Sequence, residues 1–68
     1  MGASYKITLA AARVNAVMTQ EDVAKKMGVS KFTIMNWENG KVSMKPAQFK
    51  MYCFIVGAPE ECISLPAV

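Results

Sequence analysis

Apolar residues recur at helical spacing over two short stretches in the middle of the chain, residues 20–27 and 31–38. The apolar positions are Val23, Ala24 and Met27 in the first stretch and Ile34 and Trp37 in the second. A stripe of this kind places one side of a helix against a core. The pattern therefore predicts two short helices that pack against the same interior, with Glu38 also on the inward side of the second helix.

The residues beside these stretches indicate where the two helices begin and end. Thr19 and Asp22 have the spacing of a capping box, which satisfies free N–H groups at a helix start. Ser30 can cap the second helix, and Gly28 suits the end of the first. Asn39-Gly40 would end the second helix. A turn of about three or four residues then separates the two helices, which is the spacing of a helix-turn-helix.

An earlier helix is predicted over about residues 6–16. Leu9 and Ala12 would face the core, together with either Ala16 or Arg13. The alanine run in this segment favours a helix and allows a neighbouring helix to approach closely.

Two more helices are predicted after the central pair. Pro46 suits the first turn of one of them, because proline has no N–H to lose there, and this helix should run to about residue 56. Residues 58–61 favour a short last helix, since their acids suit its positive end. Ile63 and Leu65 would then close the core.

The length and composition fit one small domain. The chain has 68 residues, of which 53% are hydrophobic, and this content favours folding over disorder. The expected fold is all-α, with five short helices in a single domain over residues 1–68 and tails at 1–5 and 66–68. No stretch approaches the roughly 20 apolar residues of a membrane span. We therefore expect a cytoplasmic protein.

Positive charge is concentrated in the middle of the chain. The net charge is +3, and six lysines from Lys25 to Lys50 stand against one acid, Glu38. A basic segment that coincides with a helix-turn-helix is typical of a protein that binds a polyanion. Without that motif, the lysines could equally form an ordinary solvated face.

The sequence offers little for catalysis or metal binding. It contains two cysteines, Cys53 and Cys62, and no histidine. Two thiols cannot complete a tetrahedral zinc site, and no base is available to activate either of them. We expect small apolar or surface roles for both cysteines, and no enzyme activity, metal, cofactor or small-molecule substrate.

The middle of the chain resembles the Cro/repressor-type (XRE-like) helix-turn-helix family of bacteriophages and bacteria. Over roughly residues 7–57, the matching positions are Arg13, Thr19, Gln20, Val23, Ala24, Met27, Gly28, Val29, Ser30, Ile34, Trp37, Glu38, Asn39 and Gly40. The resemblance implies a compact lambda-repressor-like fold and sequence-specific binding of double-stranded DNA by a phage-type or bacterial repressor. It also implies a homodimer on a palindromic operator, with each recognition helix, at about 31–38, in a major groove.

The resemblance further assigns the DNA contacts. The family presents to base edges the positions of Lys31, Phe32 and Asn36, which can respectively contact guanine, a thymine methyl and adenine. Thr33 is a weaker candidate. The residues expected at the DNA backbone are Gln20, Ser30, Asn39, Lys41 and Lys45. Phe32 could instead cover the turn, and Lys31 could contact phosphate alone.

Three further positions carry structural expectations from the resemblance. The family typically pairs Arg13 with Glu38 in a partly buried ion pair, and a guanidinium can match a carboxylate with two hydrogen bonds. Where the family usually ends the first helix with glycine, this chain has Val17. Either Val17 is held in a strained left-handed conformation, or the helix ends by another route.

The helix over residues 46–56 is apolar on more than one side. Its core-facing residues would be Phe49, Tyr52, Cys53 and Val56. Met51, Phe54 and Ile55 lie on the opposite side. Because related repressors dimerise through this region, the resemblance implies an isologous interface at these three residues, although the C-terminal segment could cover Ile55 instead. The alternative function is a protein-interaction or antitoxin-like module on the same scaffold.

Overall fold

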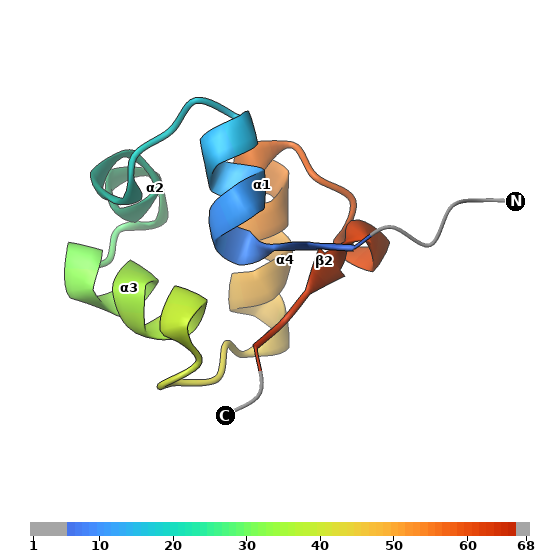
Figure 1. Ribbon diagram of the computed structural model, residues 1–68. Helices are drawn as coiled ribbons and strands as arrows, with labels where there is room; N and C mark the ends of the chain where they lie inside the picture. The colour runs from blue at the N-terminus through green and yellow to red at the C-terminus, as the bar shows by residue number, and fades with distance from the viewer. Residues whose placement is uncertain (1–5, 67–68) are drawn as a thin grey trace, which may run out of the picture.

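The computed structural model describes residues 6–66 and is mostly helical. Figure 1 shows the helices grouped around one interior, with two short strands side by side at one edge. The elements are β1 (Ile7–Thr8), α1 (Leu9–Asn15), α2 (Gln20–Met27), α3 (Lys31–Asn39), α4 (Pro46–Val56), a 3-10 turn (Glu60–Cys62) and β2 (Ile63–Ser64). The predicted tail at 1–5 and positions 67–68 lie outside the described residues.

The α2–α3 pair forms where the sequence predicts it. The Thr19 hydroxyl accepts a hydrogen bond from the Asp22 N–H at 3.0 Å, and the Asp22 carboxylate accepts one from the Thr19 N–H at 2.8 Å. The Ser30 hydroxyl accepts a hydrogen bond from the Thr33 N–H at 3.2 Å and caps α3. Both predicted caps are therefore confirmed, and α3 ends one residue later than predicted, at Asn39.

The first helix is shorter than the sequence prediction of 6–16. Ile7 and Thr8 are extended, and α1 begins at Leu9. The Thr8 hydroxyl accepts a hydrogen bond from the Ala11 N–H at 3.0 Å, so this residue caps the helix from outside. A side chain in this position competes with continuation of the helix towards the N-terminus, and this explains the difference.

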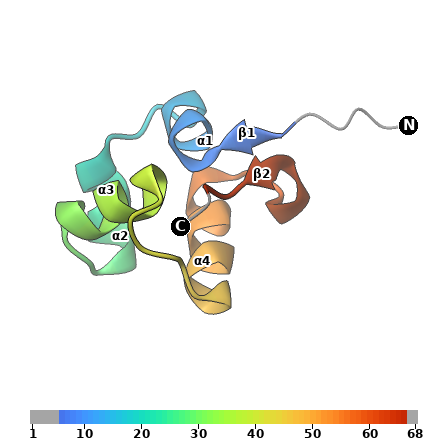
Figure 2. The ribbon, with the colours of Figure 1, turned by 60° about the horizontal axis from the view of Figure 1, so that its bottom comes forward.

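The predicted fifth helix is not an α-helix, so the strict all-α fold with five helices is not confirmed. Residues Glu60–Cys62 form only a 3-10 turn, after which β2 runs parallel to β1 with Ile7 opposite Ile63. Figure 2 shows the two strands together beyond α1. Ile63 is buried as predicted, whereas Leu65 is 46% exposed and does not close the core.

One hydrophobic core joins the four helices and β2. Its buried residues are Leu9, Ala12, Val23, Ala24, Ile34, Trp37, Tyr52, Cys53, Val56 and Ile63. The predicted inward positions of α2 and α3 are thus confirmed, except that Met27 is only partly buried. Phe49 and Ile55 are also partly buried against this core.

Each of the four helices is followed by a residue in the left-handed backbone region, directly after α2, α3 and α4, and one residue later, beyond Ala16, after α1. These residues are Gly28, Gly40 and Gly57, with φ of 72°, 78° and 71°, and Val17 after α1, with φ of 58°. The Met18 N–H donates to the Arg13 carbonyl at 3.1 Å, and the Val17 N–H donates to the Val14 carbonyl at 2.9 Å. This is the hydrogen-bond pattern of a Schellman motif. The first of the two alternatives for Val17 is therefore the observed one.

Candidate nucleic-acid interface

The outer side of α3 carries the side chains predicted to contact bases. Ile34 and Trp37 turn inward and are 0% and 3% exposed, which fixes the opposite side of the helix towards solvent. Lys31 is exposed, and Phe32 is 72% exposed, so Phe32 does not cover the turn. Asn36 is partly exposed. The predicted base-reading residues therefore lie on an accessible helix surface.

Two of the predicted contact residues also shape the start of α3. The Ser30 and Thr33 hydroxyl oxygens lie 3.1 Å apart and share a hydrogen bond. The Ser30 hydroxyl also accepts the Thr33 N–H, so this pair first of all caps the helix. A cap of this kind fixes the direction in which the first turn of α3 leaves the loop.

Gln20 takes a different position from the one expected of a free DNA contact. Its side-chain amide donates to Glu38 Oε1 at 3.0 Å, across from α2 to the end of α3. Gln20 and Lys31 nevertheless border the same open hollow of about 350 Å³ between the α1–α2 turn and α3. The residues lining it are Arg13, Met18, Thr19, Gln20, Glu21 and Lys31. The starts of the two helices thus meet on one face.

Exposed polar and basic residues continue beyond the end of α3. Asn39, Lys41 and Lys45 are all exposed. The single acid between Lys25 and Lys50 is Glu38, whose side chain is only 4% exposed and is paired with Arg13. The exposed lysines of this segment therefore face no exposed acid from within the segment, and Glu21 of α2 is the acid that borders the same hollow as Lys31.

The predicted ion pair between Arg13 and Glu38 is present. Arg13 Nε donates to Glu38 Oε2 at 2.8 Å, and Arg13 Nη2 donates to Oε1 at 3.2 Å. A third nitrogen, Nη1, donates to the Met18 carbonyl at 3.0 Å. The pair therefore joins α1 to the end of α3 and also holds the α1–α2 turn.

Tyr52 of α4 joins the same carboxylate. Its hydroxyl lies 2.6 Å from Glu38 Oε2 and 3.1 Å from the Leu9 carbonyl oxygen. The hydroxyl has one proton, and the shorter contact with the charged oxygen is the stronger place for it. Sequence reasoning placed Tyr52 in the core and missed this contact. The available signal was that a buried tyrosine hydroxyl needs a polar partner.

A family model of helix-turn-helix proteins matches residues 9–50, which is more than half of the chain. The chain belongs to this family. It is a Cro/XRE-type helix-turn-helix domain, and membership of this family indicates a DNA-binding transcription regulator. A search of curated proteins and a search of solved structures each found no match. Both strands of the helix-turn-helix domain lie outside the matched range.

The charges around Glu38 stabilise its ionised form. Burial by itself would raise the pKa of Glu38, but the hydrogen bonds from Arg13, Tyr52 and Gln20 outweigh it and lower this pKa. The hydrogen bond with Glu38 raises the pKa of Arg13. Burial, followed by the contact with Glu38, raises the pKa of Tyr52. The helix-turn-helix domain thus holds a carboxylate, a guanidinium and a neutral phenol in one network.

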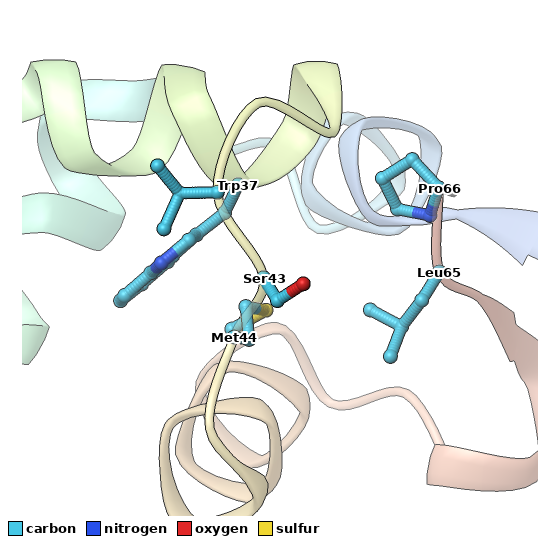
Figure 3. Close-up of a pocket in the computed structure, with 6 residues that line it drawn as sticks. Trp37, Ser43, Met44, Leu65 and Pro66 are labelled. Carbon is cyan, nitrogen blue, oxygen red and sulfur yellow. The ribbon is translucent and has the colours of Figure 1, made fainter. Parts of the chain in front are cut away.

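A second hollow of about 170 Å³ lies behind α3, on the side of Trp37 (Figure 3). Its walls come from the α3–α4 loop and the segment after β2. The residues lining it are Trp37, Val42, Ser43, Met44, Leu65 and Pro66. None of the predicted DNA contacts borders it, so it is separate from the candidate interface.

In residues 6–66 no helix has the length and apolar character needed to cross a membrane. The same residues contain no group of three or more potential metal ligands of the His, Cys, Asp and Glu types. Cys53 is buried, and its burial raises the pKa of the thiol, which disfavours a nucleophilic role.

Proposed function

We propose that this domain is a sequence-specific transcription regulator, of the phage-type or bacterial repressor kind, which inserts α3 into the major groove of double-stranded DNA. The observation that carries the proposal is the orientation of α3. Ile34 and Trp37 are buried, while Lys31, Phe32 and Asn36 are accessible, and exposed lysines follow the helix. This is the arrangement that a recognition helix requires.

Each exposed residue is assigned a particular contact with the DNA. Asn36 reads an adenine through two hydrogen bonds, Phe32 contacts a thymine methyl, and Lys31 donates to guanine or phosphate. The phosphate contacts come from Asn39, Lys41 and Lys45, with Ser30 and Thr33 near the start of α3. The side-chain amide of Gln20 donates to Glu38, so the group of Gln20 that contacts the DNA backbone is its main-chain N–H at the start of α2.

The repressor would act as a homodimer on a palindromic operator. One recognition helix covers only one half-site, and two half-sites spaced by a DNA turn match two helices related by a twofold axis. Phe54 of α4 is 85% exposed, and this exposure supports a contact between the α4 helices of two copies of the chain.

The proposal is tested by selecting bound sites from random DNA and then comparing two variants on the recovered site. Asn36→Ala should cost about 1–3 kcal/mol of binding and relax the preference at one base pair. Lys45→Ala should weaken binding to all sequences alike and reduce the salt slope by about one unit. Lys26→Ala, which removes an exposed lysine of α2 outside the proposed contacts, is the matched control.

Two outcomes would contradict this assignment. An unchanged base preference in Asn36→Ala would show that another face of the domain reads DNA. Absence of DNA binding, together with protein association that is insensitive to salt, would favour the protein-interaction or antitoxin-like alternative. The observation that favours this alternative is the exposure of the apolar Phe32 and Phe54 side chains.

A further inference from the structure

We propose that Gln20 and Tyr52 are positioning residues for DNA recognition: through Glu38 they fix the rotation of α3 about its own axis and so place Asn36 against the bases. This inference rests on the proposed function. It concerns two side chains, from α2 and α4, that both donate a hydrogen bond to the Glu38 carboxylate.

The contacts of Glu38 tie the end of α3 to all three other helices. Oε1 accepts from Arg13 Nη2 at 3.2 Å and Gln20 Nε2 at 3.0 Å. Oε2 accepts from Arg13 Nε at 2.8 Å and the Tyr52 hydroxyl at 2.6 Å. The donors belong to α1, α2 and α4 respectively. A carboxylate with partners from three directions has little freedom to shift.

The apolar contacts of α3 fix which side of the helix faces the core, and the Glu38 hydrogen bonds add directional control within that orientation. Ile34 and Trp37 hold the helix against the core, but hydrophobic attraction is not directional. Hydrogen bonds to ionised groups are directional and weaken as their geometry departs from alignment. The Glu38 network therefore selects one rotation of α3 among those that keep the same residues buried.

Any such rotation of α3 would also move Asn36. It precedes Glu38 by two residues, so the two side chains lie about 200° apart around the helix. A rotation that lengthens the bonds to Glu38 must displace Asn36 by a similar amount on the opposite side. Because pairing of an amide with adenine needs two aligned hydrogen bonds, a small displacement removes base discrimination before it removes binding to phosphate.

The test is a double-mutant cycle on the ratio of affinities for the selected site and for unrelated DNA. Asn36→Ala should lower this ratio by about tenfold in the unaltered chain. In a Tyr52→Phe background, which keeps the ring and removes only the hydroxyl, the same change should lower it by less than about threefold. Substitutions at residues that do not touch ordinarily have additive effects on free energy. A smaller effect of Asn36→Ala in the Tyr52→Phe background would therefore show that Tyr52 positions Asn36.

Ile63→Val is the matched control for a general loss of stability. Ile63 is buried in β2, outside the three helices that donate hydrogen bonds to Glu38, so this change should lower the melting temperature and leave the effect of Asn36→Ala at its full size. Circular dichroism would establish that each variant is folded at the assay temperature. A stability effect alone would not move the affinity ratio.

Gln20→Ala provides a second, independent variant, because Gln20 is partly exposed at the start of α2. Loss of a positioning contact should lower the affinity ratio, whereas loss of a phosphate contact alone would weaken all DNA equally and leave the ratio unchanged. Should Tyr52→Phe unfold at the assay temperature, Gln20→Ala carries the cycle with Asn36→Ala.

The failures of the two proposals are distinguishable. Specific binding by the unaltered chain, with Asn36→Ala fully additive to both Tyr52→Phe and Gln20→Ala, would overturn the positioning role and leave the proposed function intact. Absence of specific DNA binding by the unaltered chain would overturn both.

Discussion

Val17 is the residue at which sequence and conformation conflict most clearly. It closes α1 with φ of 58°, in the position that glycine occupies after the other three helices. A β-branched side chain is crowded in this conformation, and residues held there store strain of about 1–3 kcal/mol. The side chain is 90% exposed, so it gains almost nothing from packing in return.

Val17→Gly should therefore stabilise the domain. Relief of strain exceeds the greater unfolded-state entropy of glycine, which amounts to about 0.5–1 kcal/mol. We expect a net gain of about 1 kcal/mol, which for a domain of this size is a rise of about 4–8 °C in melting temperature. Thermal unfolding followed by circular dichroism measures it.

Val17→Ala separates conformation from side-chain loss. Alanine removes the β-branch but still resists a positive φ, so its melting temperature should fall between those of the valine and glycine chains. A lower melting temperature for Val17→Gly than for Val17→Ala would show that the entropy of the unfolded chain dominates at this position.

Among the elements, those with local signals at both ends could be predicted from the sequence. For α2 and α3, a capping residue, an apolar stripe and a left-handed glycine agree with one another, and both helices begin where predicted. The start of α4 at Pro46 and its end at Val56 were equally predictable. Agreement between independent local preferences is what makes a segment specify one conformation.

The strands and the Glu38 network could not be predicted in the same way. Each strand is two residues long and gains its hydrogen bonds only from a partner at the other end of the chain. The acids Glu60 and Glu61 gave a real helix-start signal, but it produced only a 3-10 turn. The resemblance located the Arg13–Glu38 pair, whereas the contacts of Gln20 and Tyr52 depend on how helices cross.

The Glu38 network, which joins α3 to the other three helices, predicts a specific dependence of stability on pH. The pKa of Glu38 is lower in the folded domain than its ordinary value of 4.5, so the unfolded chain binds more protons in acid. The stability from this group is complete above about pH 4.5 and is lost as the pH falls through the folded pKa. Glu38→Gln should therefore destabilise at neutral pH by about 1–3 kcal/mol, with a difference that shrinks in acid.

Urea unfolding at a series of pH values measures this effect. The pKa of Asp22 is also lowered, by the hydrogen bond from the Thr19 backbone, so Asp22 contributes in the same direction. Asp22→Asn should therefore be introduced both into the chain that keeps Glu38 and into the Glu38→Gln variant, which leaves Glu38 as the difference between them. A gap in unfolding free energy between these two chains that stays constant down to strongly acidic pH would contradict a lowered pKa.

At the scale of the whole molecule, the predicted self-association surface divides into two parts. Phe54 is 85% exposed and Met51 is 43% exposed, whereas Ile55 is partly buried against the core. The proposed contact between two copies therefore centres on Phe54 and Met51, with Ile55 at its edge. An exposed phenylalanine on a short helix gives such a contact an apolar anchor.

Phe54→Asp should yield a folded monomer that binds a palindromic site much more weakly, because two half-sites then no longer act together. Sedimentation equilibrium measures the mass, and a DNA titration measures the affinity. Val14→Asp makes a similar change at another exposed apolar residue, on α1, and should leave the mass of the dimer unchanged. A monomer at hundreds of micromolar for the unaltered chain would end this proposal.

The pairing of β1 with β2 also has a consequence for the order in which the molecule folds. Ile7 and Ile63 lie near opposite ends of the described chain, so their pairing closes a long loop, whereas α2 and α3 meet across a short turn. Contacts between distant residues form more slowly than local ones. We expect the strand pair to form late and to open early, with amide protons that exchange sooner than those of α2 and α3. An intermediate with open ends would therefore retain the helix-turn-helix while exposing two unpaired strand edges to other chains.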